Sequence, residues 1–289
     1  MGKLNESTEL ISILTDPTLL RSQAYIDGEW IDSNSKKTFN VTNPATLQII
    51  TKVPDLGVEE TRKAIDAAHK SQAGWAARTG KERAIIIHKF YQLMLDNADD
   101  LAKILTAEMG KPLAEAKGEI TYGASFLEFY AEEAKRIYGE TIPGHQSDKK
   151  LIVIKQPIGV VTSITPWNFP NAMITRKLGP ALAAGCTFVA KPAGETPLSA
   201  LAIAVLAERA GIPKGVFSMV TSKQSKLIGE EFCSNSKVRK LTFTGSTEVG
   251  RVLLKQGSEQ VLKMSMELGG NAPFIVFNDA DLDSAVEGA

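Results

Sequence analysis

Four short segments carry side chains that could hold a ligand or assist a reaction. The first runs from Thr165 to Pro170 (TPWNFP), and its two prolines stiffen the backbone on either side of Asn168. A fixed Asn amide can donate a hydrogen bond to an oxyanion as negative charge develops on a substrate. The residues alone leave open a second interpretation, in which Asn168 caps the helix that follows.

The second segment, Lys191–Pro197 (KPAGETP), places a lysine at the end of a predicted strand. A lysine at such a position, where the chain changes direction, suits ribose hydroxyls or a phosphate group. The alternative is an ordinary solvated lysine on the protein surface.

The third segment, Phe243–Ser246 (FTGS), lies immediately before a predicted helix. Free N–H groups and the positive end of the helix dipole meet at this point, which suits a pyrophosphate. The alternative is that Ser246 is an ordinary N-cap.

The fourth segment, Glu267–Asn271 (ELGGN), contains two glycines that let the backbone approach a ligand closely. Glu267 stands beside that approach and could act as a general base if burial raises its pKa. The alternative is a carboxylate that only serves a turn.

Several motifs of other enzyme classes are absent from the sequence. It contains no GxGxxG, GxxxxGK[ST], GxSxG or HExxH. His69, His88 and His145 lie far apart, so we expect no metal site. Cys186 and Cys233 are also far apart and form no CxxC pair, which argues against disulfides and structural zinc and favours a reducing, cytoplasmic setting.

The composition is that of an ordinary globular protein. The 289 residues are 43% hydrophobic, and 33 basic residues balance 33 acidic ones. No basic excess indicates a nucleic-acid partner, and the sequence has neither a signal-peptide core nor a membrane-spanning run. We therefore expect a small-molecule partner, with no nucleic acid and no membrane.

From Ile158 onward, strand-like and helix-like segments alternate. The predicted strands are GVVTSIT, CTFVAK, VFSMV, KLTFT and KMSMEL, with helices over Leu178–Ala184, Leu198–Ala210, Leu227–Phe232 and from Thr247. This alternation predicts an α/β fold with a mostly parallel, five-stranded sheet covered on both faces. Ligands of such sheets bind at the carboxyl ends of the strands, where the four segments lie.

The first half of the chain is mainly helical. Before it, Tyr25–Trp30 predicts a hairpin around an Asp-Gly turn. Between Glu59 and about Tyr138 the apolar spacing is helical, with Ala84, Ile87, Tyr91 and Met94 on one face. Asp99 is expected to cap the next helix, which should end near Gly110. Thr141–Pro157 predicts a strand that leads away from the body and back.

The four segments occur in order and together resemble the signature blocks of the aldehyde dehydrogenase superfamily. The similarity runs from about Tyr25 to the last residue. TIPG, LIVIKQPIGV, NAMITRKLGPALAAGC and ELGGNAPFIVFNDADLD are, more narrowly, similar to bacterial NADP-dependent succinate-semialdehyde dehydrogenases.

The resemblance implies a variant Rossmann fold that lacks the usual glycine fingerprint. Residues 1–140 would be the helical part of the cofactor-binding domain, and 141–158 the first piece of a β-rich oligomerisation element. Residues 159–267 would form the Rossmann-like part, and 268–289 the truncated start of a catalytic domain. Family members form homo-oligomers, so the parent enzyme is expected to be a dimer or tetramer.

The resemblance also implies roles for individual residues. Asn168 would stabilise the oxyanion, Glu267 would activate water to hydrolyse a thioester, and Arg176 would bind the distal carboxylate of the substrate. The residues implied to contact the cofactor, NADP or NAD, are Thr165, Pro166, Trp167, Lys191, Gly194, Ser246 and Leu268.

Gly194 bears on the choice of cofactor. NAD-using relatives commonly have an acidic residue at this position, three residues after the lysine, where it binds both ribose hydroxyls. Glycine removes that charge, so NADP is expected to be preferred. Glu195, the next residue, could take over the acidic role after a small shift of the backbone.

The nucleophilic cysteine of the family follows ELGG after a stretch that this sequence does not include. Neither Cys186 nor Cys233 is expected to replace it, which predicts an N-terminal fragment that is inactive alone. Two functions remain open: oxidation of succinate semialdehyde by the parent enzyme, with hydride transfer to NAD(P), or a non-catalytic nucleotide-binding module.

Overall fold

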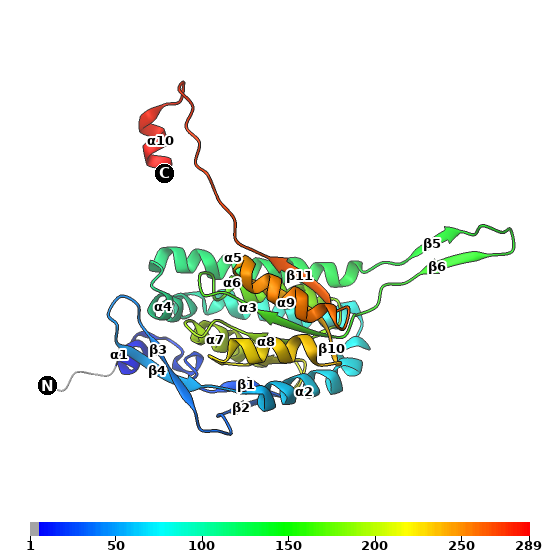
Figure 1. Cartoon of the computed structure of the whole chain (residues 1–289), viewed down its shortest axis with the longest axis horizontal. Coiled ribbons are helices and arrows are strands. Elements are labelled where there is room, and N and C mark those ends of the chain that lie inside the picture. Colours follow the sequence, from blue (N-terminus) through cyan, green and yellow to red (C-terminus); the bar gives the residue numbers. More distant parts are fainter. Residues whose placement is uncertain (1–5) are drawn as a thin grey trace.

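A seven-stranded sheet forms the centre of the molecule (Figure 1). The computed structural model describes residues 6–289, and within them the α/β fold is confirmed. The strand order is β11-β10-β7-β8-β9-β1-β2, and the first five of these pair in parallel. The parallel strands are β7 (Val160–Ile164), β8 (Thr187–Lys191), β9 (Phe217–Met219), β10 (Val238–Thr244) and β11 (Lys263–Glu267).

The five predicted parallel strands are all present, and the predicted hairpin adds two antiparallel strands to the same sheet, which was not expected. β1 (Ala24–Ile26) and β2 (Glu29–Ile31) pair antiparallel around the expected Asp-Gly turn. β1 then pairs with β9, with Tyr25 opposite Met219. No local pattern in the sequence shows which distant edge a hairpin will join, so this pairing could not be foreseen.

Helices cover the sheet on both faces. One hydrophobic core lies under α3 (Gly80–Asp96), α4 (Ala98–Met109), α5 (Leu113–Glu133), α6 (Ala172–Ala183) and α7 (Pro197–Ala210). The second core lies under α2 (Val58–Ala76), α8 (Ser225–Ser234) and α9 (Thr247–Ser258). α7 is apolar nearly all round, because it is sandwiched between the sheet and the outer helices.

The helical region follows its predicted pattern except at one boundary. Ala84, Ile87 and Met94 are buried and Tyr91 is half-buried, which confirms the predicted face. The cap of α4 is Asn97 rather than Asp99, because α3 and α4 share Asn97 as their common end. α4 ends at Gly110, as expected, with the left-handed φ of 86° that glycine tolerates.

The start of α6 was also predicted wrongly. It begins at Ala172, before the predicted Leu178, and its N-cap is Asn171. Asn171 is of a residue type that favours N-caps, but its side chain makes no capping hydrogen bond. The backbone N–H groups at this helix start bind the carboxylate of Glu119, from α5.

Several segments extend from the body. β5 (Glu140–Pro143) and β6 (Lys150–Val153) form a projecting hairpin, which confirms the predicted strand out and back (Figure 1). Residues 268–289 also run away from the sheet to α10 (Leu282–Gly288), capped by Asp281.

The remaining elements are α1 (Glu6–Ile13), β3 (Thr38–Thr42), β4 (Ile49–Pro54) and two short 3-10 turns, Pro17–Leu19 and Ala134–Arg136. Over residues 6–289, no helix has the length and apolarity to cross a membrane.

Candidate functional site

The parallel register brings the predicted site segments to one edge of the sheet. Ile164 of β7 lies opposite Lys191 of β8, and also opposite Phe243 of β10. On the other side of β10, Thr244 lies opposite Glu267 of β11. All four segments therefore begin side by side at the carboxyl ends of their strands, the usual ligand-binding edge of this kind of sheet.

Two threonines at this edge have hydroxyl groups without a protein partner. Thr165 follows β7, and its backbone N–H donates to Lys191 O at 3.2 Å. Its hydroxyl and that of Thr244 are buried, and neither makes a hydrogen bond within residues 6–289. Buried polar atoms are normally paired, so unpaired ones at a strand edge fit a polar ligand.

The loop after β7 is held by Lys111. Its Nζ donates to Asn168 O at 3.0 Å and lies 3.7 Å from the centre of the Phe169 ring. The same Nζ is 2.5 Å from Glu119 Oε2, and both side chains are nearly inaccessible to solvent. Lys111 thus fixes the backbone that carries the Asn168 side chain.

Glu119 also provides the cap of α6. Its Oε1 accepts hydrogen bonds from Asn171 N at 2.9 Å and from Ala172 N at 3.2 Å. The interpretation of Asn168 as the helix cap is therefore wrong. The Asn168 side chain and that of Trp167, which is 54% exposed, face solvent at the ligand-binding edge.

Glu108 caps α7 in the same way. Its fully buried carboxylate accepts hydrogen bonds from Leu198 N at 2.6 Å and from Ser199 N at 2.7 Å. Burial raises the pKa of Glu108 to about 8, against the lowering effect of these bonds. The helices after β7 and β8, α6 and α7, therefore both start at a carboxylate from the outer helical layer. In the sequence, Glu108 precedes Gly110 and Glu119 follows it.

Lys191 is buried, so its interpretation as a solvated surface lysine is wrong. Its side chain is 2% exposed, and Nζ donates to Pro192 O at 3.1 Å. Burial lowers its pKa to about 8, which the nearby Glu195 partly offsets. Burying a cation is costly, and such groups concentrate at functional sites.

A cavity of about 520 Å³ lies at the loops that follow β8 and β9. Gly194, Glu195 and Lys223 line it, together with Trp167. Lys223 Nζ is 3.0 Å from Glu195 Oε1. Glu195, the residue that could have taken over the acidic role absent at Gly194, is thus paired with Lys223.

Ser246 is the N-cap of α9, as one interpretation expected. Its Oγ accepts a hydrogen bond from Val249 N at 3.3 Å, and the residue is exposed. The start of the helix therefore faces solvent at the same sheet edge. Its role in binding a pyrophosphate stays a prediction.

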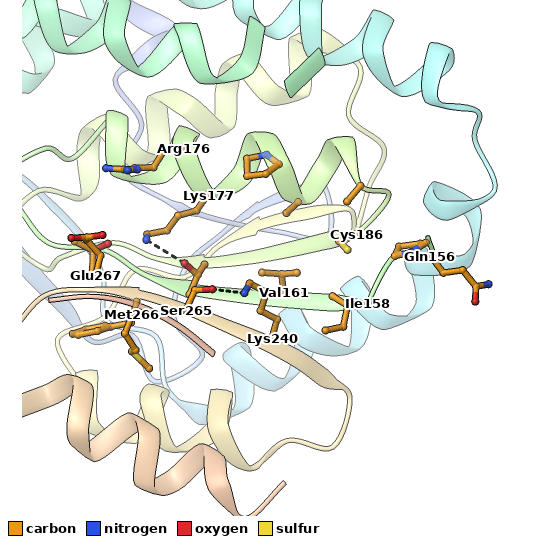
Figure 2. A pocket seen from close by; sticks show the side chains of 17 residues that line it. Gln156, Ile158, Val161, Arg176, Lys177, Cys186, Lys240, Ser265, Met266 and Glu267 are labelled. Atoms are coloured by element: carbon orange, nitrogen blue, oxygen red, sulfur yellow. Dashed lines mark hydrogen bonds between the residues drawn. The ribbon is translucent and has the colours of Figure 1, made fainter. Parts of the chain in front are cut away.

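A second cavity, of about 490 Å³, lies between α6 and the β7–β10–β11 part of the sheet (Figure 2). Arg176, Lys177 and Glu267 lie toward one end of it and Cys186 toward the other. Glu267 is exposed, so the burial that its role as a general base requires is not observed in residues 6–289. Leu268 follows it and is half-buried, with a methyl group against Gly250 of α9.

Arg176 faces this cavity without an acidic partner. Its guanidinium carbon lies 5.3 Å from the centre of the Phe126 ring, and Nη1 is 3.9 Å from Met173 Sδ. Among residues 6–289, no carboxylate forms an ion pair with it. An unpaired guanidinium beside a cavity suits an anionic ligand.

Lys177 is a residue of this cavity that the sequence did not reveal. Its Nζ donates to Thr242 Oγ1 at 3.2 Å. Burial and the nearby Arg176 together lower the pKa of Lys177 to about 8, against the raising effect of Glu267. A lysine in a helix is ordinarily solvated, so its residue type gave no sign of burial. Only its spacing along α6 could have indicated that it faces the sheet.

Neither cysteine has the properties of a nucleophile. Cys186 is 3% exposed and Cys233 is 1% exposed. Burial raises the pKa of both thiols, that of Cys233 to about 11. Cys233 lies inside α8, because the helix ends at Ser234 and not at the predicted Phe232. Reactive thiols are partly exposed and have lowered pKa values, so both cysteines belong to the core.

No cluster of three His, Cys, Asp or Glu side chains suited to a metal ion was found in residues 6–289.

Comparison with known proteins identifies the family. Residues 30–289 match the aldehyde dehydrogenase family. The chain belongs to this family.

Individual members of the aldehyde dehydrogenase family are very similar to it. The chain is 64% identical to the glutarate-semialdehyde dehydrogenase of Pseudomonas aeruginosa over 276 residues, which cover 96% of the chain and 57% of that protein. It is 62% identical to the NADP(+) succinate-semialdehyde dehydrogenase of Escherichia coli, with the same coverage. The crystal structure of an NADP-dependent enzyme of E. coli superposes with a TM-score of 0.93 at 62% identity, over 95% of this chain and 57% of that one. The chain spans somewhat more than half the length of these relatives.

The Lys111–Glu119 pair gives a prediction about stability. Glu119→Gln leaves Lys111 buried without its counter-charge and weakens the cap of α6. We expect the free energy of unfolding to fall by about 3 kcal/mol, as for other broken buried ion pairs. Denaturant unfolding measures this change.

The matched control is Glu132→Gln, which removes an exposed carboxylate paired with Lys135 at 2.8 Å. Exposed ion pairs contribute little to stability, so the denaturant midpoint of this variant should stay close to that of the unchanged chain. Equal effects of the two substitutions would contradict the role assigned to Glu119.

Lys191 gives a prediction about pH dependence. Its folded pKa, about 8, lies below the ordinary value of 10.5, so the folded state bears the cost of a buried cation at neutral pH. Lys191→Met should therefore raise the free energy of unfolding by about 1–2 kcal/mol at neutral pH. Between the two pKa values the unfolded chain binds more protons than the folded one, so the unchanged protein gains stability as pH rises.

The advantage of the Met variant should therefore shrink as pH rises through 8 and be largely lost near 10.5. Urea unfolding of both proteins across this range measures it. A Met variant that is less stable at neutral pH would show that Lys191 stabilises the fold.

Proposed function

We propose that this chain binds NADP or NAD and forms the cofactor-binding part of an enzyme that oxidises succinate semialdehyde to succinate. The observation that carries the proposal is the meeting of four polar segments at the carboxyl edge of one parallel sheet. The unpaired hydroxyls of Thr165 and Thr244 and the buried Lys191 fit a polar cofactor there. The NADP-dependent E. coli relative, at 62% identity, supports this choice.

The cofactor would lie across the strand ends. Lys191 would bind the adenosine ribose, beside Gly194, and Ser246 would hold the pyrophosphate at the exposed start of α9. The remaining predicted contacts are those of Thr165, Pro166, Trp167 and Leu268. When bound, the cofactor accepts a hydride from the substrate.

Two residues would assist the chemistry. The Asn168 amide would donate to the oxyanion that forms when a thiolate adds to the aldehyde, and Lys111 keeps its backbone in place. Glu267 would take a proton from the water that hydrolyses the resulting thioester. Because Glu267 is exposed in this chain, that role requires further protein to cover the cavity.

The substrate proposal rests on Arg176. The P. aeruginosa and E. coli relatives are named for glutarate and succinate semialdehyde, two aldehydes that carry a carboxylate at their other end. A guanidinium without an acidic partner, on the same cavity as Glu267, suits such a carboxylate. We favour succinate semialdehyde over its homologue, which is longer by a single methylene group.

The second candidate function is a nucleotide-binding module without catalysis. Within residues 6–289 neither Cys186 nor Cys233 offers the accessible thiolate that the chemistry above requires, so nucleotide binding is the part of the function that these residues could carry by themselves. For both candidate functions we propose that the chain self-associates through the projecting β5–β6 hairpin. The side chains of Leu151 and Ile152 in this hairpin are exposed.

The first prediction from the proposed function concerns cofactor preference. The chain should bind NADP+ more tightly than NAD+, because no carboxylate at Gly194 repels the 2′-phosphate. Gly194→Glu should reverse the preference, with NADP+ affinity falling about 10-fold relative to NAD+. Calorimetric titration with both dinucleotides tests this, and tighter binding of NAD+ by the unchanged chain would contradict it.

The second prediction concerns Arg176 and requires a complete active site. A chimera can join residues 1–289 to the remaining sequence of the E. coli relative. In it, Arg176→Ala should raise KM for succinate semialdehyde by about 10-fold or more, since a charge-assisted bond to the substrate is lost. KM for butanal, which has no carboxylate, should change little. An equal rise of KM for both aldehydes would indicate that Arg176 has a structural role.

The third prediction concerns turnover by the 289-residue chain itself. It should form no NADPH from succinate semialdehyde at an enzymatic rate, because loss of a nucleophile typically costs on the order of 10⁴-fold or more. NADPH absorbance follows the reaction before and after alkylation under mildly denaturing, reversible conditions. Turnover abolished by alkylation would identify Cys186 or Cys233 as the nucleophile. Turnover that survives alkylation would contradict a thiol mechanism altogether.

A further inference from the structure

Lys223 lies in the loop that follows β9, beside the segment that follows β8. The sheet order places β8 and β9 next to each other, so both loops leave from the same edge. Lys223 therefore stands across from Gly194 and Glu195 on the cavity of about 520 Å³. Its position results from the fold and not from proximity in the sequence.

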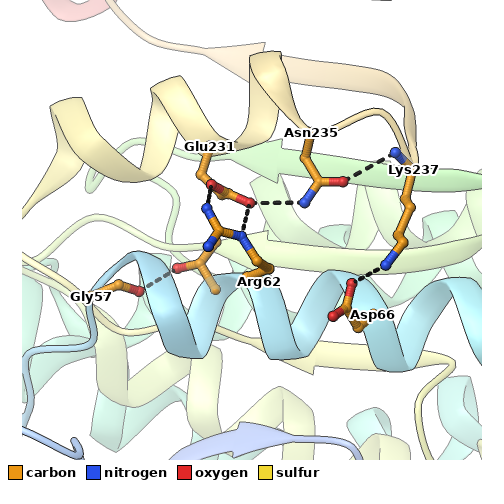
Figure 3. A network of polar contacts seen from close by, with 7 residues as sticks. Gly57, Arg62, Asp66, Glu231, Asn235 and Lys237 are labelled. Atoms are coloured by element: carbon orange, nitrogen blue, oxygen red, sulfur yellow. Dashed lines mark hydrogen bonds and ion pairs between the residues drawn. The ribbon is translucent and has the colours of Figure 1, made fainter.

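The backbone at Lys223 is fixed on both sides. Its N–H donates to Asp55 Oδ1 at 2.9 Å, and Ser222 Oγ donates to Leu56 O at 2.7 Å. The helix that follows, α8, is joined to α2 by a bidentate pair between Arg62 and Glu231 (Figure 3). The lysine is thus presented from a rigid base.

The side chain of Lys223 lies over Gly194. A Cβ atom at Gly194 would be 2.7 Å from Lys223 Cδ, so only glycine leaves the stem undisturbed there. Nζ lies 5.6 Å from the centre of the Phe39 ring and 3.0 Å from Glu195 Oε1. The side chain remains 44% exposed, so an anion in the cavity can reach it.

Lys191 is less suited to a phosphate. Its ammonium group is buried and already donates to Pro192 O, so only a group close to the strand end can contact it. A ribose hydroxyl meets that requirement. A phosphate carries two negative charges and needs a cation that is accessible and stays protonated.

We propose that Lys223 binds the 2′-phosphate of NADP and sets the cofactor preference of this chain. The inference rests on the proposed function, since it requires a dinucleotide at the strand ends. In the free protein Lys223 neutralises Glu195, whose charge would otherwise repel the phosphate. With NADP bound, its ammonium group contacts the phosphate, in the way that a basic residue replaces the usual acid in NADP-binding folds.

The test is calorimetric titration of the 289-residue chain with NADP+ and with NAD+. Lys223→Gln keeps most of the stem over Gly194 but removes the charge. It should weaken NADP+ binding about 10-fold and leave NAD+ binding within about twofold, as expected for one lost charge-assisted bond. The matched control is Lys226→Gln, an exposed lysine in the first turn of α8, which should alter neither affinity.

A double variant separates direct contact from neutralisation of Glu195. In Lys223→Gln with Glu195→Gln, both charges are gone. If Lys223 touches the phosphate, NADP+ binding stays several-fold weaker than in the unchanged chain. Full recovery of NADP+ affinity would show that Lys223 acts only on Glu195, and would overturn the proposal.

Two further outcomes separate this inference from the proposed function. Equal loss of NADP+ and NAD+ affinity in Lys223→Gln, or no loss at all, would overturn the role of Lys223 alone. Failure of the unchanged chain to bind either dinucleotide would overturn the proposed function, and this inference with it.

Discussion

The first backbone N–H groups of α6 and α7 have no partners within their own helices, and two buried carboxylates bind them. Glu119 and Glu108 come from the outer helical layer, on either side of Gly110. Because a helix start must be satisfied when buried, these bonds fix where the chain goes after β7 and β8. The loop that carries Asn168 and the loop that follows Lys191 are positioned by this constraint, and Lys111 adds a contact to the first of them.

The same edge of the sheet holds cations at a cost to stability. Lys177 and Lys191 both have pKa values lowered to about 8 by burial, and neither forms an ion pair at close range within residues 6–289. A fold selected only for stability would place apolar side chains there. The placement is understandable if anionic groups of a cofactor or substrate bind at this edge and compensate the charge.

Local patterns in the sequence predicted much of this arrangement, and long-range contacts account for what they missed. The five parallel strands, the Asp-Gly hairpin and the cap at Ser246 all have local signals. The start of α6 was missed because the carboxylate that binds its first N–H groups, that of Glu119, lies in another helix. Burial also reversed the interpretation of Lys191, since nothing around a lysine in the sequence reveals whether the fold will cover it.

Hydrogen exchange of the backbone amides, with and without NADP+, tests the central claim that the strand ends form one cofactor site. Protection on adding NADP+ should be concentrated in residues 165–169, 191–196, 222–224 and 245–249, which follow β7, β8, β9 and β10. These segments are far apart in the sequence and share only the sheet edge. Protection elsewhere, such as around the basic cavity lined by Arg78, Lys81 and Lys155, or no protection at all, would contradict the claim.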